Sequence, residues 1–133
     1  MSKEVYLIGE IRTNNFTDKN LFEKIGSLWS KTNDHEHNIE NDMKYGIYHQ
    51  YESNYRGDYT LAIATETPVS NEKFVIPDQE YAVFECLQDE HSIGETWKKI
   101  WQLEEEKKLN RKYSLDFEKY YPDGKVEIHI AIL

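Results

Sequence analysis

The sequence predicts an α+β domain made of two similar halves, each with the order strand, helix, strand, strand. Apolar residues alternate in several short segments and recur at helical spacing in two longer ones. The order of these segments occurs twice along the chain. We therefore expect a tandem β-α-β-β repeat with pseudo-twofold symmetry, which forms a mainly antiparallel sheet with both helices on one face.

The first half begins with a predicted strand at Val5–Ile11. The helix that follows has its apolar residues on one stripe, at Leu21, Phe22, Ile25, Leu28 and Trp29. The polar segment 32–42, rich in His and Asn, is predicted as a loop. Two further strands are predicted at residues 44–53 and 58–67.

The second half has the same order, beginning with a predicted strand at residues 79–88. Its helix has apolar residues on one stripe, at Ile93, Trp97, Ile100 and Trp101. Ser92 and Glu95 have the spacing of a capping box, which predicts the start of this helix. Strands are predicted at residues 113–121 and 125–133, and the second alternates cleanly between apolar and polar residues.

Individual residues also match between the halves. Leu28-Trp29 corresponds to Ile100-Trp101, 72 residues further along (28 to 100). Ile47-Tyr48 corresponds to Phe117-Glu118, 70 residues further along (47 to 117). These matches indicate a duplication, and a pseudo-twofold axis between the halves would leave a cleft where they meet.

The chain of 133 residues is long enough for one core, so we expect a single domain over residues 1–133. Its halves are residues 1–67 and 78–133. The polar segment 68–77, with a proline at each end, is the expected linker.

Composition excludes several classes of function. A net charge of −9 argues against direct nucleic-acid binding, which depends on neutralising phosphates. A lone cysteine, Cys86, excludes an intramolecular disulfide and suits a reducing compartment. The chain has neither a signal peptide nor an apolar run of membrane-spanning length, so we expect a cytoplasmic protein that does not enter membranes.

The sequence predicts no metal or cofactor. His35 and His37 flank Glu36 in a polar loop, but two imidazoles do not supply the three or four convergent ligands of a zinc site. Aromatic residues make up 14% of the chain, more than a core of this size needs. Some of these rings are therefore expected to line a pocket or an interface.

The strongest candidate site residue lies in the segment Leu115–Tyr121. As a strand, this segment places Leu115 and Phe117 on one face, and Asp116, Glu118 and Tyr120 on the other. A buried carboxylate needs a partner, and a cationic ligand can supply one.

Two interpretations of Glu118 are open at this point. It is either an anionic anchor in a pocket, flanked by Tyr120 and by Tyr48 from the matching strand, or an exposed glutamate paired with Lys119 or Lys125. Aromatic rings attract a cation with about 0.5–2 kcal/mol each, which favours a cationic ligand if the pocket exists. Alternation alone does not decide between the two.

The helix tryptophans are further candidates. Trp97 and Trp101 share a helix face, and both are compatible with simple packing on the sheet. Trp101 has Trp29 as its counterpart, whereas Trp97 has Ile25, and this asymmetry makes Trp97 the stronger candidate for a pocket ring. The tyrosines that precede and follow Tyr48 are equally compatible with cross-strand packing.

Several segments resemble the GyrI-like effector-binding domains, over nearly the whole chain. They are Tyr45–Tyr48, Tyr81–Phe84, Ile93–Trp101, Asp116–Tyr120 and Val126–Ile130. Such domains form the ligand-sensing part of AraC- and MerR-type multidrug regulators, and also occur alone as integron-associated effector-binding proteins and as the DNA gyrase inhibitor. The Phe-Glu-x-Tyr strand is the most specific element, and the resemblance implies that Glu118 pairs with lipophilic cations.

The resemblance has departures that affect the pocket rim. Pro77-Asp78-Gln79-Glu80 replaces the Pro-Ala-Gly that commonly precedes the Tyr-Ala-Val-Phe strand, and Glu104–Glu106 replaces a common Trp-Leu-Pro run. Ala131 takes the place of a proline in the last strand. These differences do not touch Glu118.

Three functions follow as hypotheses. The leading one is a stand-alone protein that binds lipophilic cationic or amphipathic compounds through Glu118, Tyr48, Trp97, Tyr120 and Trp101, in transcription regulation or in drug sensing and sequestration. The second is a hydrolase of reactive cyclopropane-type compounds that uses Glu118 and Tyr48; binding is favoured over catalysis. The third is an acidic inhibitor of DNA gyrase. Residues 1–4 leave no room for a helix-turn-helix, so a regulatory role would require a regulator or topoisomerase partner.

Overall fold

The computed structural model describes residues 3–33, 43–54, 56–68 and 71–133. Its elements in chain order are β1 (Lys3–Thr13), α1 (Leu21–Asn33), β2 (Lys44–His49), β3 (Tyr59–Thr65), β4 (Lys73–Ile76), β5 (Tyr81–Leu87), α2 (Glu90–Glu105), β6 (Leu115–Tyr120) and β7 (Lys125–Ala131).

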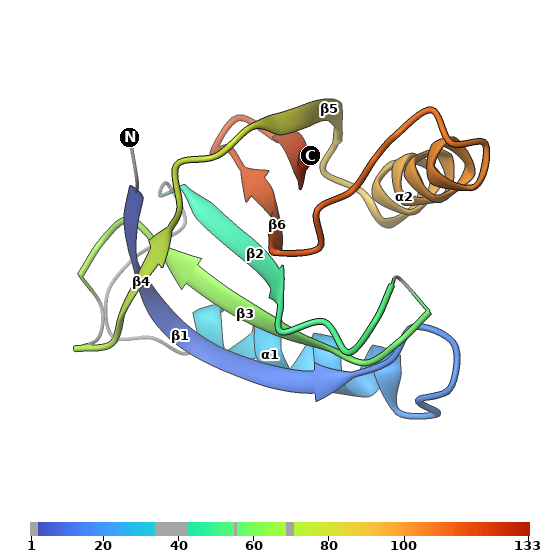
Figure 1. Cartoon of the computed structure of the whole chain (residues 1–133). Coiled ribbons are helices and arrows are strands. Elements are labelled where there is room, and N and C mark those ends of the chain that lie inside the picture. The colour runs from blue at the N-terminus through green and yellow to red at the C-terminus, as the bar shows by residue number, and fades with distance from the viewer. Residues whose placement is uncertain (1–2, 34–42, 55, 69–70) are drawn as a thin grey trace.

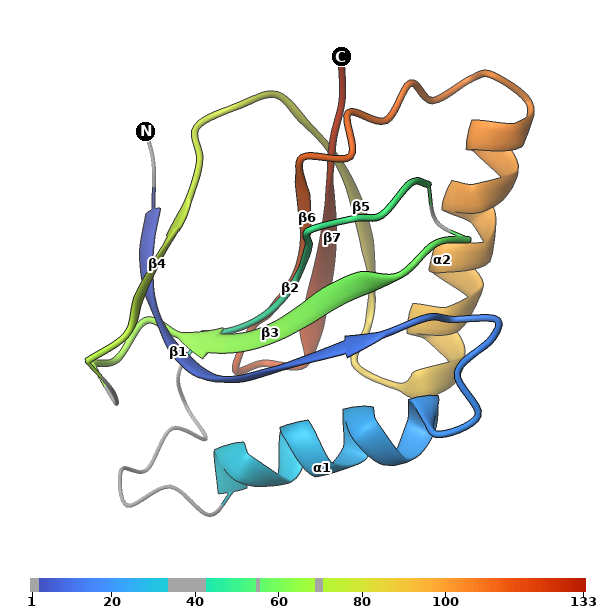
Figure 2. The same cartoon turned by 60° about the horizontal axis from the view of Figure 1, so that its bottom comes forward.

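The seven strands form one antiparallel sheet with the order β4-β1-β3-β2-β6-β7-β5. The sheet curls into a half-barrel, and both helices pack on its outer face (Figures 1 and 2). This arrangement confirms the predicted α+β class. In Figure 2 the helix α1 lies beneath β1 and β3, and α2 lies beside β5.

The two halves meet at the centre of the sheet, where β2 pairs with β6. Ile47 is paired with Phe117, and these two residues also correspond in the sequence repeat. Two residues that correspond in the repeat and also lie opposite each other on paired strands are next to the pseudo-twofold axis. The residues that follow them, Tyr48 and Glu118, therefore lie diagonally across the β2–β6 pair, within reach of long side chains.

Both faces of the central strands are buried. On the outer face, Leu28 of α1 packs with Leu61 and Ile63, while Ile100 of α2 packs with Ile128 and Ile130. On the inner face of the curl, a third cluster is centred on Val5, Tyr45, Ile47, Ala62 and Phe117. Burying each large apolar side chain contributes about 1.5–3 kcal/mol, so the half-barrel is stabilised from both sides.

The start of α2 differs from the prediction. The N-cap is Asp89 rather than Ser92, because the Asp89 carboxylate accepts a hydrogen bond from the Ser92 backbone N–H at 2.7 Å. Ser92 occupies the third helical position, and its hydroxyl accepts a hydrogen bond from the Leu87 N–H at 3.0 Å. The helix therefore begins with a simple Asp N-cap one turn before the predicted capping box, since Asp caps a helix as well as Ser does.

Three further features differ from the prediction. The strand β2 ends at His49 instead of continuing to residue 53, because Gln50 has a φ of 53°, which is incompatible with an extended strand. The expected linker contains a strand, β4, which pairs with β1 at the edge of the sheet. Phe22 was placed on the buried stripe of its helix but is 87% exposed. The helix α1 extends to Asn33, and the rest of the predicted loop lies outside the described residues.

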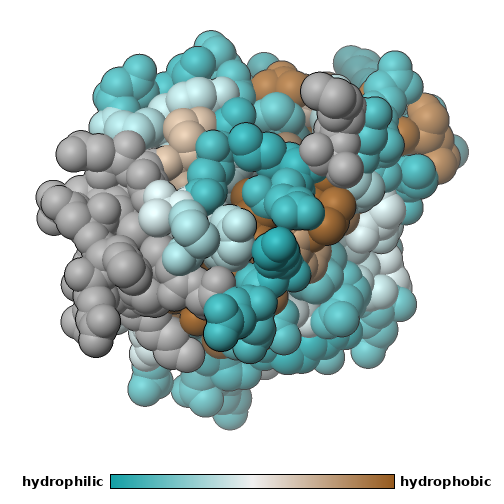
Figure 3. Space-filling view, turned by 90° about the vertical axis from the view of Figure 1, so that its left-hand side faces the viewer, coloured by the Kyte–Doolittle hydropathy of each residue, from teal (hydrophilic) through white to brown (hydrophobic). Residues whose placement is uncertain are grey.

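Figure 3 shows the side of the molecule on which β4 forms the edge of the sheet. The visible surface of the described residues on this side is mainly hydrophilic. Lys73 of β4 is exposed, and a charged side chain on an edge strand opposes pairing with another chain.

Candidate functional site

A cavity of about 750 Å³ lies between α1 and α2, over the central strands of the sheet. All five predicted site residues line it: Glu118, Tyr48, Trp97, Tyr120 and Trp101. Trp29 lines it as well, so all three tryptophans of the chain border the same space. The lining also includes Asn15, Phe22, Lys44, Tyr51, Tyr59, Gly94, Lys98 and Arg111.

Glu118 lies at the base of this cavity, on β6, and is only 3% exposed. Three side chains donate hydrogen bonds to its carboxylate. Trp97 Nε1 donates to Oε2 at 2.6 Å, the Tyr48 hydroxyl donates to Oε2 at 3.0 Å, and the Tyr120 hydroxyl donates to Oε1 at 2.5 Å. These three donors orient the carboxylate without neutralising its charge.

The carboxylate fits here because the residue opposite it is a glycine. Gly46 is paired with Glu118 across β2 and β6. A Cβ at this position would lie 3.1 Å from Glu118 Oε1, which is closer than nearly all contacts of this kind. Gly46 therefore makes the space for the carboxylate, a role for glycine in strands that closely approach another group.

The electrostatics of the site follow from burial. Burial raises the pKa of Glu118 above its ordinary value of 4.5, although the hydrogen bonds from Tyr120, Trp97 and Tyr48 act in the opposite direction. Burial and the neighbouring Glu118 carboxylate raise the pKa of both Tyr48 and Tyr120 well above 10.0. Both phenols therefore remain neutral donors over the physiological pH range.

No lysine or arginine in the described ranges forms an ion pair with Glu118. Lys125 instead lies near Glu85 and Glu127, at 3.9 and 3.7 Å, and Lys119 lies over the Tyr121 ring. The interpretation of Glu118 as an exposed glutamate paired with Lys119 or Lys125 is therefore wrong.

Aromatic rings surround the carboxylate in edge-to-face or tilted contacts. The Tyr48 ring lies 5.2 Å from Trp97 and 5.4 Å from Tyr59, and the Trp29 ring lies 5.1 Å from Tyr120. Such contacts stabilise a pair of rings by about 0.5–1.5 kcal/mol and hold their positions. The rings therefore form a pre-arranged wall around a buried negative charge.

Trp101 lies one turn further along α2 than Trp97 and also lines the cavity. Its ring lies 5.6 Å from Phe16, so it joins the loop before α1 to the second half of the chain. Tyr59 contacts the same loop, where its hydroxyl donates to Asn15 Oδ1 at 2.5 Å. Trp101 thus borders the cavity but is more distant from the Glu118 hydrogen bonds than Trp97 is.

A second buried carboxylate, Asp116, lies two residues before Glu118 and is fully buried. Arg111 Nη2 donates to Asp116 Oδ2 at 2.6 Å, and Ala131 N donates to Oδ1 at 2.8 Å. The Tyr51 hydroxyl also donates to Asp116 Oδ2. Asp116 is therefore neutralised within the protein, unlike Glu118.

No sequence pattern pairs Asp116 with Arg111, because Arg111 precedes β6 in an irregular segment. Tyr51 reaches the cavity because the left-handed conformation of Gln50 ends the alternation of β2. Alternation did place Asp116 on the same face as Glu118, and this was the one signal that pointed toward the network.

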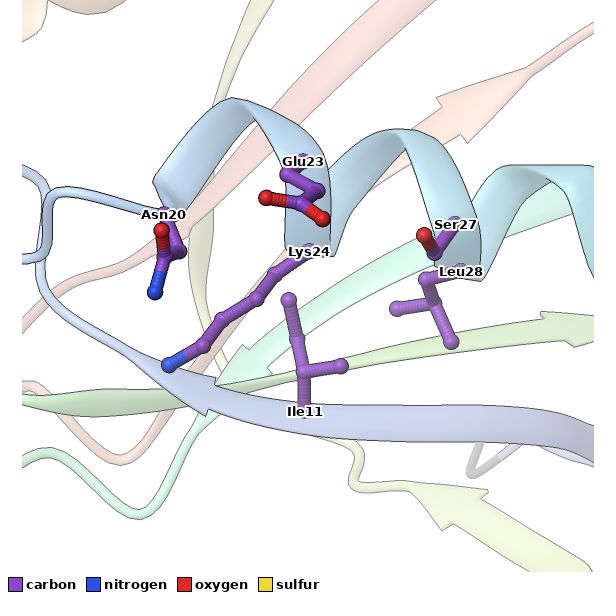
Figure 4. A pocket seen from close by; sticks show the side chains of 6 residues that line it. All are labelled: Ile11, Asn20, Glu23, Lys24, Ser27 and Leu28. Atoms are coloured by element: carbon purple, nitrogen blue, oxygen red, sulfur yellow. The ribbon is translucent and has the colours of Figure 1, made fainter.

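A smaller recess of about 310 Å³ lies between α1 and β1 (Figure 4). Asn20, Glu23 and Ser27 form its polar walls, and Lys24 extends across it. Lys24 Nζ is paired with Asp18 Oδ2 at 2.6 Å. The recess therefore has neither an unpaired buried charge nor an aromatic wall, and the larger cavity is the stronger candidate site.

The described residues contain no group of three or more His, Cys, Asp or Glu side chains arranged to hold a metal ion. The His35-Glu36-His37 cluster lies outside them. Within the part of the chain that the structure describes, no helix is both long enough and apolar enough to cross a membrane.

The family model for the integron-associated effector binding protein matches residues 5–132. The chain belongs to this family. A comparison with curated protein sequences gives no significant match.

Solved structures share the fold over the whole length of the chain. An integron cassette protein from the mobile metagenome of Vibrio cholerae is 25% identical with a TM-score of 0.81, over 99% of this chain and 91% of that one. SAV2435 bound to tetraphenylphosphonium is 12% identical with a TM-score of 0.67, over 99% and 89%. A putative transcription regulation protein from Staphylococcus aureus MU50 is 12% identical with a TM-score of 0.63, over 99% and 96%. The cavity is thus the candidate effector site of an effector-binding fold.

Proposed function

We propose that this member of the family binds lipophilic cations in the cavity, with Glu118 as the counter-ion of the bound ligand. The observation that carries the proposal is a buried carboxylate with three hydrogen-bond donors and no cationic partner among the described residues. A buried charge without an opposite charge is costly. A cation that enters the cavity supplies the missing charge.

The cavity suits a ligand with several rings. Its volume of about 750 Å³ lies within the range of pockets for drug-sized molecules, roughly 300–1,000 Å³. Faces of Trp, Tyr and Phe rings attract cations with about 0.5–2 kcal/mol each. The solved structure of SAV2435 with tetraphenylphosphonium, a lipophilic cation, supports this ligand class through the shared fold.

The proposed biological role is that of a sensor or a sequestering protein for such compounds, in transcription regulation or in drug defence. The similarity to a putative transcription regulation protein supports the regulatory role at the level of the fold. A regulator or topoisomerase partner stays a prediction from the sequence.

The test is titration with tetraphenylphosphonium, followed by tryptophan fluorescence, for the wild type and Glu118→Gln. Since all three tryptophans border the cavity, binding is expected to change the fluorescence. Loss of the carboxylate charge is expected to weaken binding at least tenfold, or about 1.4 kcal/mol. Glu85→Gln is the matched control, because it removes an exposed charge from β5, outside the cavity lining. Equal affinities of Glu118→Gln and wild type would contradict the proposal.

A second candidate function uses the same carboxylate as a general base in the hydrolysis of reactive cyclopropane-type compounds. The raised pKa of Glu118 and its contact with the Tyr48 hydroxyl at 3.0 Å favour it, since a base works best when its pKa approaches the operating pH. Incubation with an electrophilic cyclopropane and mass detection of a hydrolysed product distinguish catalysis from binding. Product formed by the wild type but not by Glu118→Gln would support the hydrolase.

A further inference from the structure

Two residues border the open side of the cavity, one from each helix, and they occupy corresponding positions in the sequence repeat. The offset of 72 that relates the helix stripes (28 to 100) also relates Phe22 of α1 to Gly94 of α2. Both residues line the cavity. Phe22 is 87% exposed, whereas Gly94 carries no side chain. The two corresponding positions at the mouth therefore carry a large aromatic ring at Phe22 and no side chain at Gly94.

The gap at Gly94 has no explanation in packing. A Cβ built at Gly94 would meet nothing within 4 Å, and its φ is not in the left-handed region. Glycine inside a helix costs about 0.5–1 kcal/mol relative to alanine. Because Gly94 also lines the cavity, the missing side chain leaves the α2 backbone at this position open to the cavity.

We propose that Gly94 is a specificity-determining residue that keeps the mouth of the cavity wide enough for bulky, multi-ring cations. One ring of such a ligand lies against the α2 backbone at Gly94, opposite the Phe22 ring, while the positive centre lies deeper, towards Glu118. The proposal rests on the proposed function for the charge of the ligand and extends it to ligand size.

The charge of Lys98, close to Gly94 on α2, is directed away from the cavity. Lys98 lies one helical turn after Gly94, lines the cavity and is exposed. Its ammonium group lies 3.5 Å from Glu95, on the outside of α2. Ile93, which precedes Gly94, also lines the cavity, so the apolar part of a ligand meets an apolar surface beside the Gly94 backbone.

The chain contains a matched control. Gly26 lies inside α1, also has nothing within 4 Å of a built Cβ, and does not line the cavity. A Cβ at either position meets open space, so both alanine variants are expected to fold and to raise the melting temperature. The melting temperatures of the leucine and phenylalanine variants check that these larger side chains also leave the protein folded. Only substitutions at position 94 narrow the mouth.

The experiment measures tetraphenylphosphonium affinity for the alanine, leucine and phenylalanine variants at both positions. Affinity is expected to fall progressively with side-chain size at position 94, by at least tenfold for Gly94→Phe, and to remain within twofold of wild type for Gly26→Phe. If the wild type binds tetraphenylphosphonium and Gly94→Phe binds it with the same affinity, the inference is overturned and the proposed function remains intact.

A second measurement needs no ligand. Acrylamide, a small neutral quencher, is expected to reach the three tryptophans through the cavity that they line. Quenching of tryptophan fluorescence is expected to fall in Gly94→Phe and to stay at the wild-type level in Gly26→Phe. If the wild type does not bind tetraphenylphosphonium, the proposed function fails for this probe. Equal quenching of tryptophan fluorescence in both phenylalanine variants would separately overturn the role of Gly94.

Discussion

Two buried carboxylates lie two residues apart on β6, and they differ in what surrounds them. Asp116 is paired with Arg111 at 2.6 Å and also accepts hydrogen bonds from Tyr51 and Ala131. Glu118 accepts hydrogen bonds from neutral groups alone. Both are acids on the same face of one strand, yet only Asp116 has its charge neutralised by the described residues.

The difference separates a structural charge from a functional one. Arg111 is nearly enclosed, with its side chain 1% exposed, so its bond to Asp116 fixes the segment before β6 against the sheet. Burial opposes the charge of Arg111, but the nearby Asp116 carboxylate raises the pKa of the guanidinium above its usual value. Glu118 borders an open cavity instead, where a ligand is able to supply the opposite charge.

The largest expected effect comes from breaking the Asp116–Arg111 pair. Asp116→Asn leaves the buried Arg111 without its strongest charge partner, and loss of one member of a buried pair typically costs about 3–5 kcal/mol. Urea unfolding at neutral pH measures the loss of stability.

Glu118→Gln is the control for this loss. Because burial raises the pKa of Glu118, the ionised carboxylate is less favourable in the folded state than in the unfolded state. A neutral glutamine is therefore expected to keep the free energy of unfolding at neutral pH at or above the wild-type value. Equal destabilisation by the two substitutions would remove the distinction between the carboxylates.

The next effect tests how the fold makes room for Glu118. Gly46→Ala places a Cβ 3.1 Å from Glu118 Oε1, and overpacking of this kind costs about 1–3 kcal/mol. The cost is expected to fall in a Glu118→Ala background, since the other neighbours of this Cβ lie at 3.8 Å. A double-mutant cycle by urea unfolding measures the coupling, and additive effects would contradict the role of Gly46.

The pH dependence of binding follows from the raised pKa of Glu118. A cation favours the ionised carboxylate, so tetraphenylphosphonium affinity is expected to fall as pH falls through this pKa, beginning above the ordinary value of 4.5. Below the pKa the loss approaches about tenfold per pH unit. The contribution of Glu118 to stability changes in the opposite direction, because protonation favours the folded state without ligand.

Titrations of fluorescence at a series of pH values, from acidic to neutral, measure this dependence. The probe has a permanent charge, so its own protonation does not contribute. Glu118→Gln should show a flat profile over the same range. A wild-type profile as flat as that of the variant would show that Glu118 does not set the affinity.

Matched tyrosines also distinguish the two carboxylates. Tyr48→Phe and Tyr51→Phe each remove one hydroxyl that donates to a buried acid, Glu118 or Asp116. A hydrogen bond to a charged group contributes about 1.5–3 kcal/mol. Tyr48→Phe is expected to shift the pH profile of ligand binding upwards, because Glu118 loses a donor that lowers its pKa. Tyr51→Phe is expected to lower stability and to leave that profile unchanged, as measured by the same two assays.

Much of the site was accessible from local patterns. Helical stripes identified the faces of α1 and α2, and alternation in β6 placed Glu118 and Tyr120 on the face opposite Phe117. The repeat aligned Tyr48 with Glu118, and the β2–β6 register brings their side chains to 3.0 Å. A duplicated sequence carries this long-range information because a twofold relation between halves determines which strands meet at the axis.

Other features had no local signal. The role of Gly46 depends on which residue of β6 lies opposite it, and the strand β4 forms because β1 offers a free edge to a segment with a weak pattern of its own. Phe22 follows the helical period, but α1 leaves its ring outside the packed interface.

The sequence by itself determined the class of fold, the duplication and the identity of a carboxylate among aromatic residues, because periodicity and repetition are properties of the chain. Tertiary structure alone decided that Asp116 is neutralised and Glu118 is not. Arg111 reaches Asp116 only when the segment after α2 folds back against β7, where Arg111 forms a bridge with Ile132. Which charges meet depends on distances of a few ångströms between distant segments, and no local pattern encodes them.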